Sequence, residues 1–140
     1  MPKKCSLDTG FITLYLTGEL PEKWTRVANG ISKGRTTGLV PEGVVSETYY
    51  QLLKDHRKEE VERMIMKLKG IQGIRLVEIN NRIAILSGYY HFRFREFGLS
   101  LVDCSLLAIG HMEKAEIYTT DGNLKLAAKK LNIPCNHIVI

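Results

Sequence analysis

The stretch AEIYTTDGNLKLAAKKLNIPCNHIVI, residues 115–140, contains the pattern that decides the fold. It predicts a strand over 115–120 that stops at Asp121, then a helix over 123–132 that Pro134 terminates, and then a last strand. Strands that are separated by helices imply right-handed crossovers, and hence a mainly parallel sheet between layers of helices. The sequence therefore predicts an α/β fold.

The rest of the chain continues this alternation toward the N-terminus. Strands are expected over 4–8 and within 37–45, and helices over 10–19, 22–33, 46–55, 57–69, 75–90 and 100–114. No internal repeat, low-complexity tract or long linker divides the sequence. We therefore expect one domain over residues 1–140, built as a three-layer α/β/α sandwich around a mainly parallel central sheet.

Composition limits the class of protein. A chain of 140 residues with 44% hydrophobic residues can bury one ordinary core. Its 20 Lys and Arg against 15 Asp and Glu give a net charge of +5, which is compatible with a polyanionic partner and does not identify one.

The three cysteines, Cys5, Cys104 and Cys135, are widely spaced and form no CxxC pair, so we expect reduced thiols and a cytoplasmic location. No apolar run is long enough to span a membrane, and Asp8 interrupts the stretch that a signal peptide would need, so no membrane partner is expected.

Four carboxylates lie where predicted strands end or predicted helices begin. Asp8 ends the first strand, Asp121 ends the strand before the last helix, Glu47 opens a helix, and Asp103 follows Ser100 by three residues. Each placement has a purely structural explanation: a capping box at Ser100, a favourable helix dipole for Glu47, and caps or turns for the other two. Ligands of open α/β sheets, however, bind outside the carboxyl ends of the strands, and these acids are expected there.

Taken together, the four acids favour a metal site. Carboxylates that share one edge of a sheet repel one another, and no Lys or Arg adjoins them in the sequence. A divalent cation would relieve that repulsion, and a site with oxygen ligands alone suits Mg²⁺ or Mn²⁺ better than zinc. Such an ion can activate water for attack on a phosphodiester.

Four segments, in this order and at these separations, also resemble a known family. They are SLDTGFI (6–12), VSETYYQLL (45–53), LSLVDCSLLAIG (99–110) and YTTDGNLKLAAKKL (118–131). They resemble the PIN domain, and most of all its short single-domain members that act as VapC-type ribonuclease toxins. The resemblance covers residues 4 to about 139. It implies a Mg²⁺- or Mn²⁺-dependent endoribonuclease that hydrolyses RNA, the toxin of a type II toxin–antitoxin pair, with a homodimer and a cognate antitoxin as expected partners.

The resemblance also implies roles for individual side chains. The metal-binding and catalytic residues would be Asp8, Glu47, Asp103 and Asp121. The supporting residues would be Thr9, one or both of Thr119 and Thr120, and Asn123. Because some members carry a further acid where this chain has Asn123, the resemblance leaves open whether one or two metal ions bind.

Two basic segments are candidates for contacts with RNA. The run YYHFRFREF, residues 89–97, mixes aromatic residues with Arg93 and Arg95, which suits the stacking of bases and the binding of phosphates. The same run also fits a helix whose phenylalanines are core and whose arginines are solvated. Lys33 and Arg35, in a glycine-rich stretch that does not match a phosphate-binding loop, are weaker candidates.

Other functions remain open at this point. A haloacid-dehalogenase-like phosphatase is excluded because the sequence Asp8-Thr9-Gly10 lacks the second aspartate that such enzymes need. A PIN-like module that binds RNA or protein without useful catalysis, or an RNA-processing factor that is not a toxin, would share the same fold.

Overall fold

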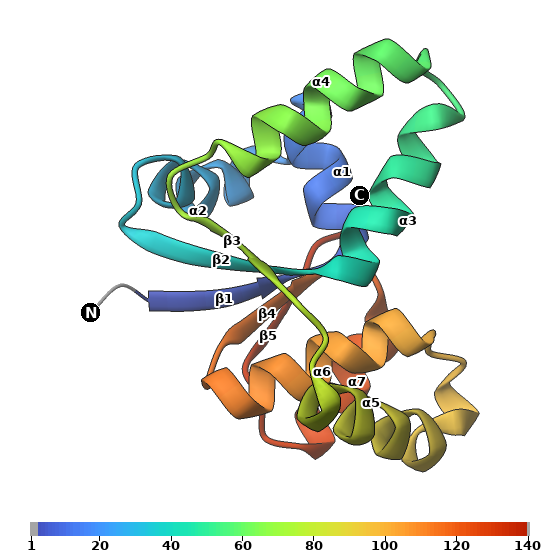
Figure 1. Ribbon diagram of the computed structural model, residues 1–140. Coiled ribbons are helices and arrows are strands. Elements are labelled where there is room, and N and C mark those ends of the chain that lie inside the picture. Colours follow the sequence, from blue (N-terminus) through green and yellow to red (C-terminus); the bar gives the residue numbers. More distant parts are fainter. Residues whose placement is uncertain (1–2, 140) are drawn as a thin grey trace.

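A five-stranded parallel sheet lies between two layers of helices in the computed structural model, which describes residues 3–139 (Figure 1). The strands are β1 (Lys3–Leu7), β2 (Thr36–Pro41), β3 (Ile74–Val77), β4 (Glu116–Thr119) and β5 (Cys135–His137), in the spatial order β3-β2-β1-β4-β5. The helices are α1 (Thr9–Thr17), α2 (Glu22–Ser32), α3 (Glu42–Leu53), α4 (Lys58–Lys69), α5 (Asn81–Arg93), α6 (Leu101–Glu113) and α7 (Gly122–Lys130), with a short 3₁₀ turn, η1, at Arg95–Phe97.

The order of the strands decides which face each helix covers. The chain runs outward from β1 through β2 to β3, and then returns past β1 to β4 and β5. Because crossovers between parallel strands are right-handed, these two directions place α1–α4 on one face and α5–α7 on the other, as Figure 1 shows. The predicted three-layer α/β/α architecture with a parallel sheet is confirmed.

This topology creates a crevice between β1 and β4. The two strands are hydrogen-bonded neighbours, but the chain leaves β1 into α1 on one face and leaves β4 into α7 on the other. Such a switch point, at the carboxyl ends of the strands, is where open α/β sheets bind ligands. Asp8 directly follows β1, and Asp121 lies two residues after the end of β4.

The core fills both spaces between sheet and helices. Its largest fully buried side chains include Leu7, Phe11, Leu39, Ile109 and Ile117. Helix α6 is buried along seven consecutive residues, 104–110, which explains the apolar composition of that segment. A smaller cluster of Leu52, Val61 and Ile65 joins α3 to α4, so the expected apolar stripe of α4 is a packing surface.

Two predicted boundaries are wrong. The segment 75–90 is not one helix: Ile74–Val77 forms the edge strand β3, and Asn80 then caps α5 by accepting a hydrogen bond from Ile83 N at 3.0 Å. Helix α3 begins at Glu42 rather than Ser46, directly after Pro41 ends β2. Glu47 therefore lies in the second turn of α3, and the helix dipole does not explain its position.

The remaining boundaries agree with the prediction to within a few residues. The last strand ends at His137, earlier than expected, and residue 140 of the predicted strand lies outside the described residues, as do residues 1–2 of the predicted domain. Across residues 3–139, none of the helices has both the length and the apolar character that crossing a bilayer requires.

Candidate active site

All four predicted carboxylates line one cleft of about 530 Å³ at the carboxyl edge of the sheet. The acidic side chains are those of Asp8, Glu47, Asp103 and Asp121. The other lining residues are Thr9, Gly10, Ser46, Tyr50, Gln51, Ser100 and Thr120, so the lining contains no Lys, Arg or His. We call this site the acidic cleft.

Asp8 is the most deeply buried of these acids, with 5% of its surface exposed. It caps α1: Oδ1 accepts a hydrogen bond from Phe11 N at 2.7 Å, while Oδ2 accepts from Thr119 Oγ1 at 2.6 Å and from Thr120 N at 2.9 Å. Burial raises the pKa of Asp8 above 3.8, these hydrogen bonds lower it, and the charge of Asp121 raises it again. The carboxylate is thus fixed in orientation by donors that carry no formal charge.

Gly10 allows the first turn of α1 to approach the end of β4. A Cβ atom at this position would lie 2.1 Å from Thr120 Oγ1, closer than any real contact. A side chain here would therefore push Thr120 away from Asp8, whose Oδ2 accepts the Thr120 N–H. Gly10 was not among the predicted site residues, because nothing in the sequence shows which residue faces it.

Thr119 connects two of the acids and is fully buried. Its hydroxyl donates to Asp8 and accepts a hydrogen bond from Asp121 N at 2.9 Å. Asp121 in turn caps α7 by accepting from Asn123 N at 2.8 Å, and Asn123 Nδ2 donates to Phe97 O at 3.0 Å. The two threonines therefore have different positions: the Thr119 side chain bridges the acids, whereas Thr120 lines the cleft and donates its N–H.

Thr9 and Glu47 join α1 to α3 in the lining of the cleft. Thr9 Oγ1 donates a hydrogen bond of 2.6 Å to Glu47 Oε1. The two residues come from neighbouring helices that both follow strands of the sheet. Thr9 thus fixes the direction in which the Glu47 carboxylate points.

Asp103 both caps a helix and lines the cleft. Its Oδ2 accepts from Ser100 N at 3.1 Å, and its own N–H donates to Ser100 Oγ at 3.0 Å, which completes a capping box at the start of α6. Burial raises the pKa of Asp103, the bonds with Ser100 lower it, and the charges of Asp121 and Glu47 raise it. Asp103 therefore forms the predicted capping box and also lies in the cleft with the other acids, so capping does not exclude a role in the site.

The donor chemistry of the cleft fits a hard divalent cation. It offers carboxylate oxygens, the ligands that Mg²⁺ and Mn²⁺ prefer. None of the ion pairs within residues 3–139 involves any of the four acids, so their charges are not neutralised by Lys or Arg. In the same part of the chain, however, no three Asp, Glu, His or Cys side chains are grouped closely enough to hold a metal ion together.

The four predicted RNA-contacting residues do not line the acidic cleft. The Arg93 guanidinium lies 5.1 Å from the ring centre of Phe94, and the Arg95 guanidinium lies 4.3 Å from that of Phe92. Phe94 is buried in the core, whereas Phe92 is 66% exposed, so the core interpretation of this run holds only in part. Of the other two, Arg35 lines a separate pocket, and Lys33 is exposed and does not line that pocket.

Sequence reasoning missed an exposed aromatic residue at the mouth of the cleft. Tyr50 and Gln51 line the cleft one turn after Glu47 on α3, and Tyr50 is 63% exposed. Lys54 Nζ, one turn further along, lies 4.9 Å from the centre of the Tyr50 ring. Since residues three and four apart share a helix face, the spacing from Glu47 was a signal that could have found them.

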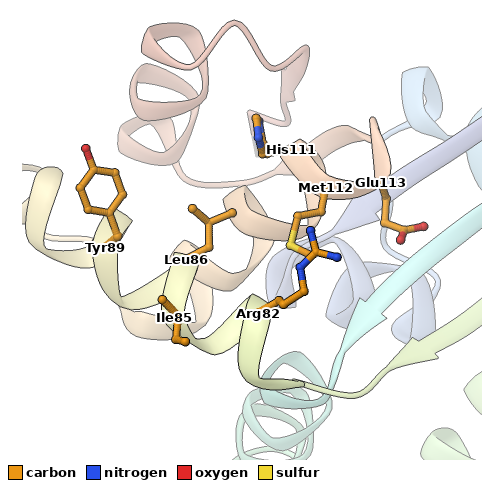
Figure 2. A pocket seen from close by; sticks show the side chains of 7 residues that line it. All are labelled: Arg82, Ile85, Leu86, Tyr89, His111, Met112 and Glu113. Atoms are coloured by element: carbon orange, nitrogen blue, oxygen red, sulfur yellow. The ribbon is translucent and has the colours of Figure 1, made fainter.

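A larger hollow, of about 880 Å³, lies between α5 and α6 and lacks this chemistry (Figure 2). It is lined by Arg82, Ile85, Leu86, Tyr89, His111, Met112 and Glu113. Its one carboxylate, Glu113 Oε1, already accepts hydrogen bonds from Lys4 at 3.1 Å and from Arg75 at 2.9 Å. The acidic cleft is therefore the better candidate for an active site.

Comparison with solved structures shows which known folds the sheet and its helices resemble. VapBC2 from Rickettsia felis, bound to a DNA fragment from its promoter, is similar over 97% of this chain and 99% of the other, with a TM-score of 0.72 and 14% identity. DNA-bound VapBC from Salmonella typhimurium matches over 98% of each chain, with a TM-score of 0.74 and 14% identity. The chain has the VapC fold. The expected resemblance to the PIN-domain toxins is thereby confirmed at the level of the fold.

A third VapC structure is similar over a smaller share of the chain. VapC20 from Mycobacterium tuberculosis, a toxin that cleaves the sarcin–ricin loop, matches over 88% of this chain and 94% of its own, with a TM-score of 0.67 and 14% identity. No protein-family model and no curated protein matches the sequence itself. At 14% identity, the similarity to these VapC structures shows a shared fold and does not show a shared activity.

Proposed function

We propose that this chain is a metal-dependent endoribonuclease, the toxin of a type II toxin–antitoxin pair, and that it hydrolyses RNA phosphodiester bonds in the acidic cleft. One observation carries the proposal: a buried carboxylate, Asp8, lies at the switch point of the sheet without a cationic partner and shares its cleft with three more acids. The VapC fold supports the same activity, since VapC20, which has this fold, is a toxin that cleaves the sarcin–ricin loop.

In this proposal Asp8, Asp103 and Asp121 would hold Mg²⁺ or Mn²⁺ once the ion has drawn them together, because in the structure they line one cleft without being grouped closely enough to bind it jointly. The bound ion would supply a Lewis acid for the phosphate group and lower the pKa of a water molecule. Thr119 and the Thr120 N–H keep Asp8 oriented, so that this ligand need not reorganise. Asn123 has a neutral amide at a position where a carboxylate would strengthen the binding of a second metal ion. Its Nδ2 already donates a hydrogen bond to Phe97 O, so this residue favours a single ion.

Glu47 is the proposed base. Its Oε1 accepts the Thr9 hydroxyl at 2.6 Å, which leaves Oε2 to orient the attacking water and accept its proton. Glu47 comes from α3, whereas Asp8 and Asp121 follow β1 and β4 and Asp103 lies on α6, so the proposed base and the proposed ligands belong to different elements that line one cleft.

Tyr50 and Lys54 are proposed to position the RNA strand. The lining of the cleft contains no cation, so the polyanionic substrate needs positive charge at the rim, and Lys54, which directly follows α3, lies against the ring of the lining residue Tyr50. The exposed ring of Tyr50 can stack a base beside the reacting phosphate. A base on Tyr50 and a phosphate on Lys54 would fix the register of the strand relative to Glu47.

The experiment that tests the nuclease is cleavage of an end-labelled RNA. We expect cleavage with Mg²⁺ or Mn²⁺, none in excess EDTA, and none by Asp8→Asn. Asp55→Asn is the matched control, because Asp55 is exposed and does not line the cleft. Cleavage that persists in EDTA, or by Asp8→Asn, contradicts the proposal, and RNA binding without any cleavage would instead identify a binding module.

The partners follow from the same proposal. Several of the similar solved structures are VapBC complexes, so we propose a cognate antitoxin for this chain, together with a homodimer and a cytoplasmic location. Co-purification with the product of a small neighbouring gene that blocks cleavage would support the antitoxin. Sedimentation velocity distinguishes the mass of one chain from that of two. A stable monomer would contradict the dimer without affecting the nuclease.

A further inference from the structure

A second pocket, of about 510 Å³, lies against α2 and shares no lining residue with the acidic cleft. It is lined by Lys3, Cys5, Lys23, Trp24, Arg26, Val27, Gly30, Arg35, Thr36 and Tyr118. Figure 1 shows α2 over the amino-terminal halves of β1 and β2, toward the opposite end of these strands from Asp8. We call it the basic pocket, because its lining contains four cationic side chains and no acid.

Most of this positive charge is not neutralised. Lys3 Nζ pairs with Glu116 Oε2 at 2.6 Å. Within the part of the chain that the structure describes, no ion pair involves Lys23, Arg26 or Arg35. Like charges around one concave surface repel each other, and the field they create there attracts anions. Three cationic side chains of this pocket thus have no acidic partner among residues 3–139.

The wall of the basic pocket is aromatic. The Trp24 ring meets Tyr118 edge to face, with ring centres 5.4 Å apart, and Lys23 Nζ lies 5.4 Å from the centre of the Trp24 ring. Two guanidinium groups, an ammonium group and an indole around one cavity match the two parts of a nucleotide. Guanidinium groups bind phosphate through paired N–H donors, and aromatic rings contact the base.

We propose that the basic pocket binds the phosphate of a nucleotide, either within an RNA strand or free, through Arg26, Arg35 and Lys23 beside Trp24. This site goes beyond the proposed nuclease and does not depend on it. The proposal also gives Arg35 a role in binding phosphate, whereas Lys33, two residues earlier, lies outside the pocket. An acidic peptide would use the same charges but would have no base to place against the aromatic wall.

Trp24 makes the proposal directly measurable, because it is the single tryptophan of the chain. Its fluorescence is followed in the full chain during titration with inorganic phosphate, with UMP and with an oligouridylate of about eight nucleotides. EDTA is present throughout, so that no RNA is cut. We expect a saturable change with UMP or the oligonucleotide, reversed by excess phosphate. Binding of UMP identifies a free nucleotide as a sufficient ligand, and binding of the oligonucleotide alone identifies a strand.

The variants locate the ligand. Arg26→Gln and Arg35→Gln should each weaken binding about tenfold, as the loss of a charge-assisted hydrogen bond does. For the oligonucleotide, each should also reduce the slope of log affinity against log salt by about 0.7. Lys33→Gln is the matched control, since it removes an exposed cation two residues from Arg35, and it should leave the affinity within about twofold of that of the unchanged chain.

Three results would overturn the proposal. They are the absence of a saturable change with any nucleotide, an equal loss of affinity in Lys33→Gln, and an equal fluorescence response to polyglutamate, which would identify an acidic protein as the partner. Melting temperatures of the variants confirm that each is folded before its affinity is compared. Cleavage is blocked in this experiment, so the titration tests the basic pocket alone. If the chain binds nucleotides in the titration but cuts no RNA in the separate cleavage assay, the basic pocket is supported and the nuclease proposal is contradicted.

Discussion

Thr119 and Asp8 are 111 positions apart in the sequence, and the threonine hydroxyl donates a hydrogen bond of 2.6 Å to the aspartate Oδ2. The same hydroxyl accepts the N–H of Asp121. One buried side chain therefore fixes the acid that follows β1 relative to the acid that follows β4. The geometry of the acidic cleft depends on this contact as much as on the carboxylates themselves.

Thr119→Val tests that dependence. Valine keeps the shape but leaves Asp8 Oδ2 and Asp121 N each without one partner, so we expect a loss of about 1–3 kcal/mol in the free energy of unfolding. Because the hydroxyl lowers the pKa of Asp8, its loss should also shift the acidic limb of the cleavage profile to higher pH. Thr119→Ser retains the hydroxyl and should restore both. A valine variant with unchanged stability and pH profile would show that Thr119 only fills space.

Asp8→Asn tests whether the cleft binds metal. The neutral side chain avoids the cost of a buried charge, but its amide group meets N–H donors of Thr120 or Phe11, a conflict that costs about 1–3 kcal/mol. The two effects oppose each other, so the melting temperature without metal should change little. Mg²⁺ at 100 times its dissociation constant should stabilise the unchanged chain by about 2.7 kcal/mol and the variant hardly at all. An equal Mg²⁺-induced rise in both proteins would place the ion elsewhere.

The raised pKa of Asp8 predicts a pH dependence of stability with a definite sign. Above the raised folded-state pKa the carboxylate is ionised in both states, and the folded state bears the cost of burying it. As the pH falls through the raised folded-state pKa toward 3.8, the folded state takes up the proton first and that cost disappears. The unchanged chain should therefore gain stability relative to Asp8→Asn.

Urea unfolding of both proteins at a series of pH values measures this difference. Acids that do not interact with Asp8 cancel in the comparison. Glu113, for example, has a pKa lowered by the hydrogen bonds from Lys4 and Arg75, and it contributes the opposite slope to both proteins. A difference in stability that does not vary with pH would mean that Asp8 is not perturbed in the folded state.

The sequence was informative where a signal is local. Apolar runs and caps located β1, α6 and α7, and strand ends located Asp8 and Asp121. The edge strand β3 was missed because four residues, only partly buried, are too few to show a period of two against the helical pattern that follows. Ser46 suggested a helix start, but β2 ends at Pro41 and α3 begins there without a side-chain cap.

The contacts that complete the site could not be predicted from the sequence, for a different reason. Gly10 matters only because Thr120 faces it, and Thr119 matters only because β1 and β4 are neighbours in the sheet. Both facts depend on which strands pair, and the sequence does not show this. The charges of Arg26 and Arg35 likewise meet across α2 and the start of β2 only in the folded chain.

Ser100 and Asp103 allow capping and metal binding to be separated on one helix. Ser100→Ala removes the side-chain acceptor of the α6 cap and should cost about 1 kcal/mol of stability while the Mg²⁺-induced rise in melting temperature remains. Asp103→Asn keeps an oxygen that can accept the Ser100 N–H but removes the charge, so stability should change less and the Mg²⁺ response should fall. The reverse pattern would show that Asp103 is a capping residue alone.

Tyr50 and Lys54 give the sharpest test of how RNA lies in the cleft. If a base stacks on Tyr50, Tyr50→Ala should lose about 1–3 kcal/mol of binding, a fall in kcat/KM of roughly 5- to 150-fold, carried mainly by KM. Tyr50→Phe keeps the ring and should stay near the unchanged value. Lys54→Gln should instead reduce the salt dependence of KM: the slope of log KM against log salt should fall by about 0.7 for the loss of one phosphate contact.

Tyr89→Ala is the matched control, because that tyrosine is 55% exposed on α5 and does not line the cleft. Should Tyr50→Ala and Tyr89→Ala behave alike, the strand does not follow α3, and the substrate must approach the four carboxylates from another wall.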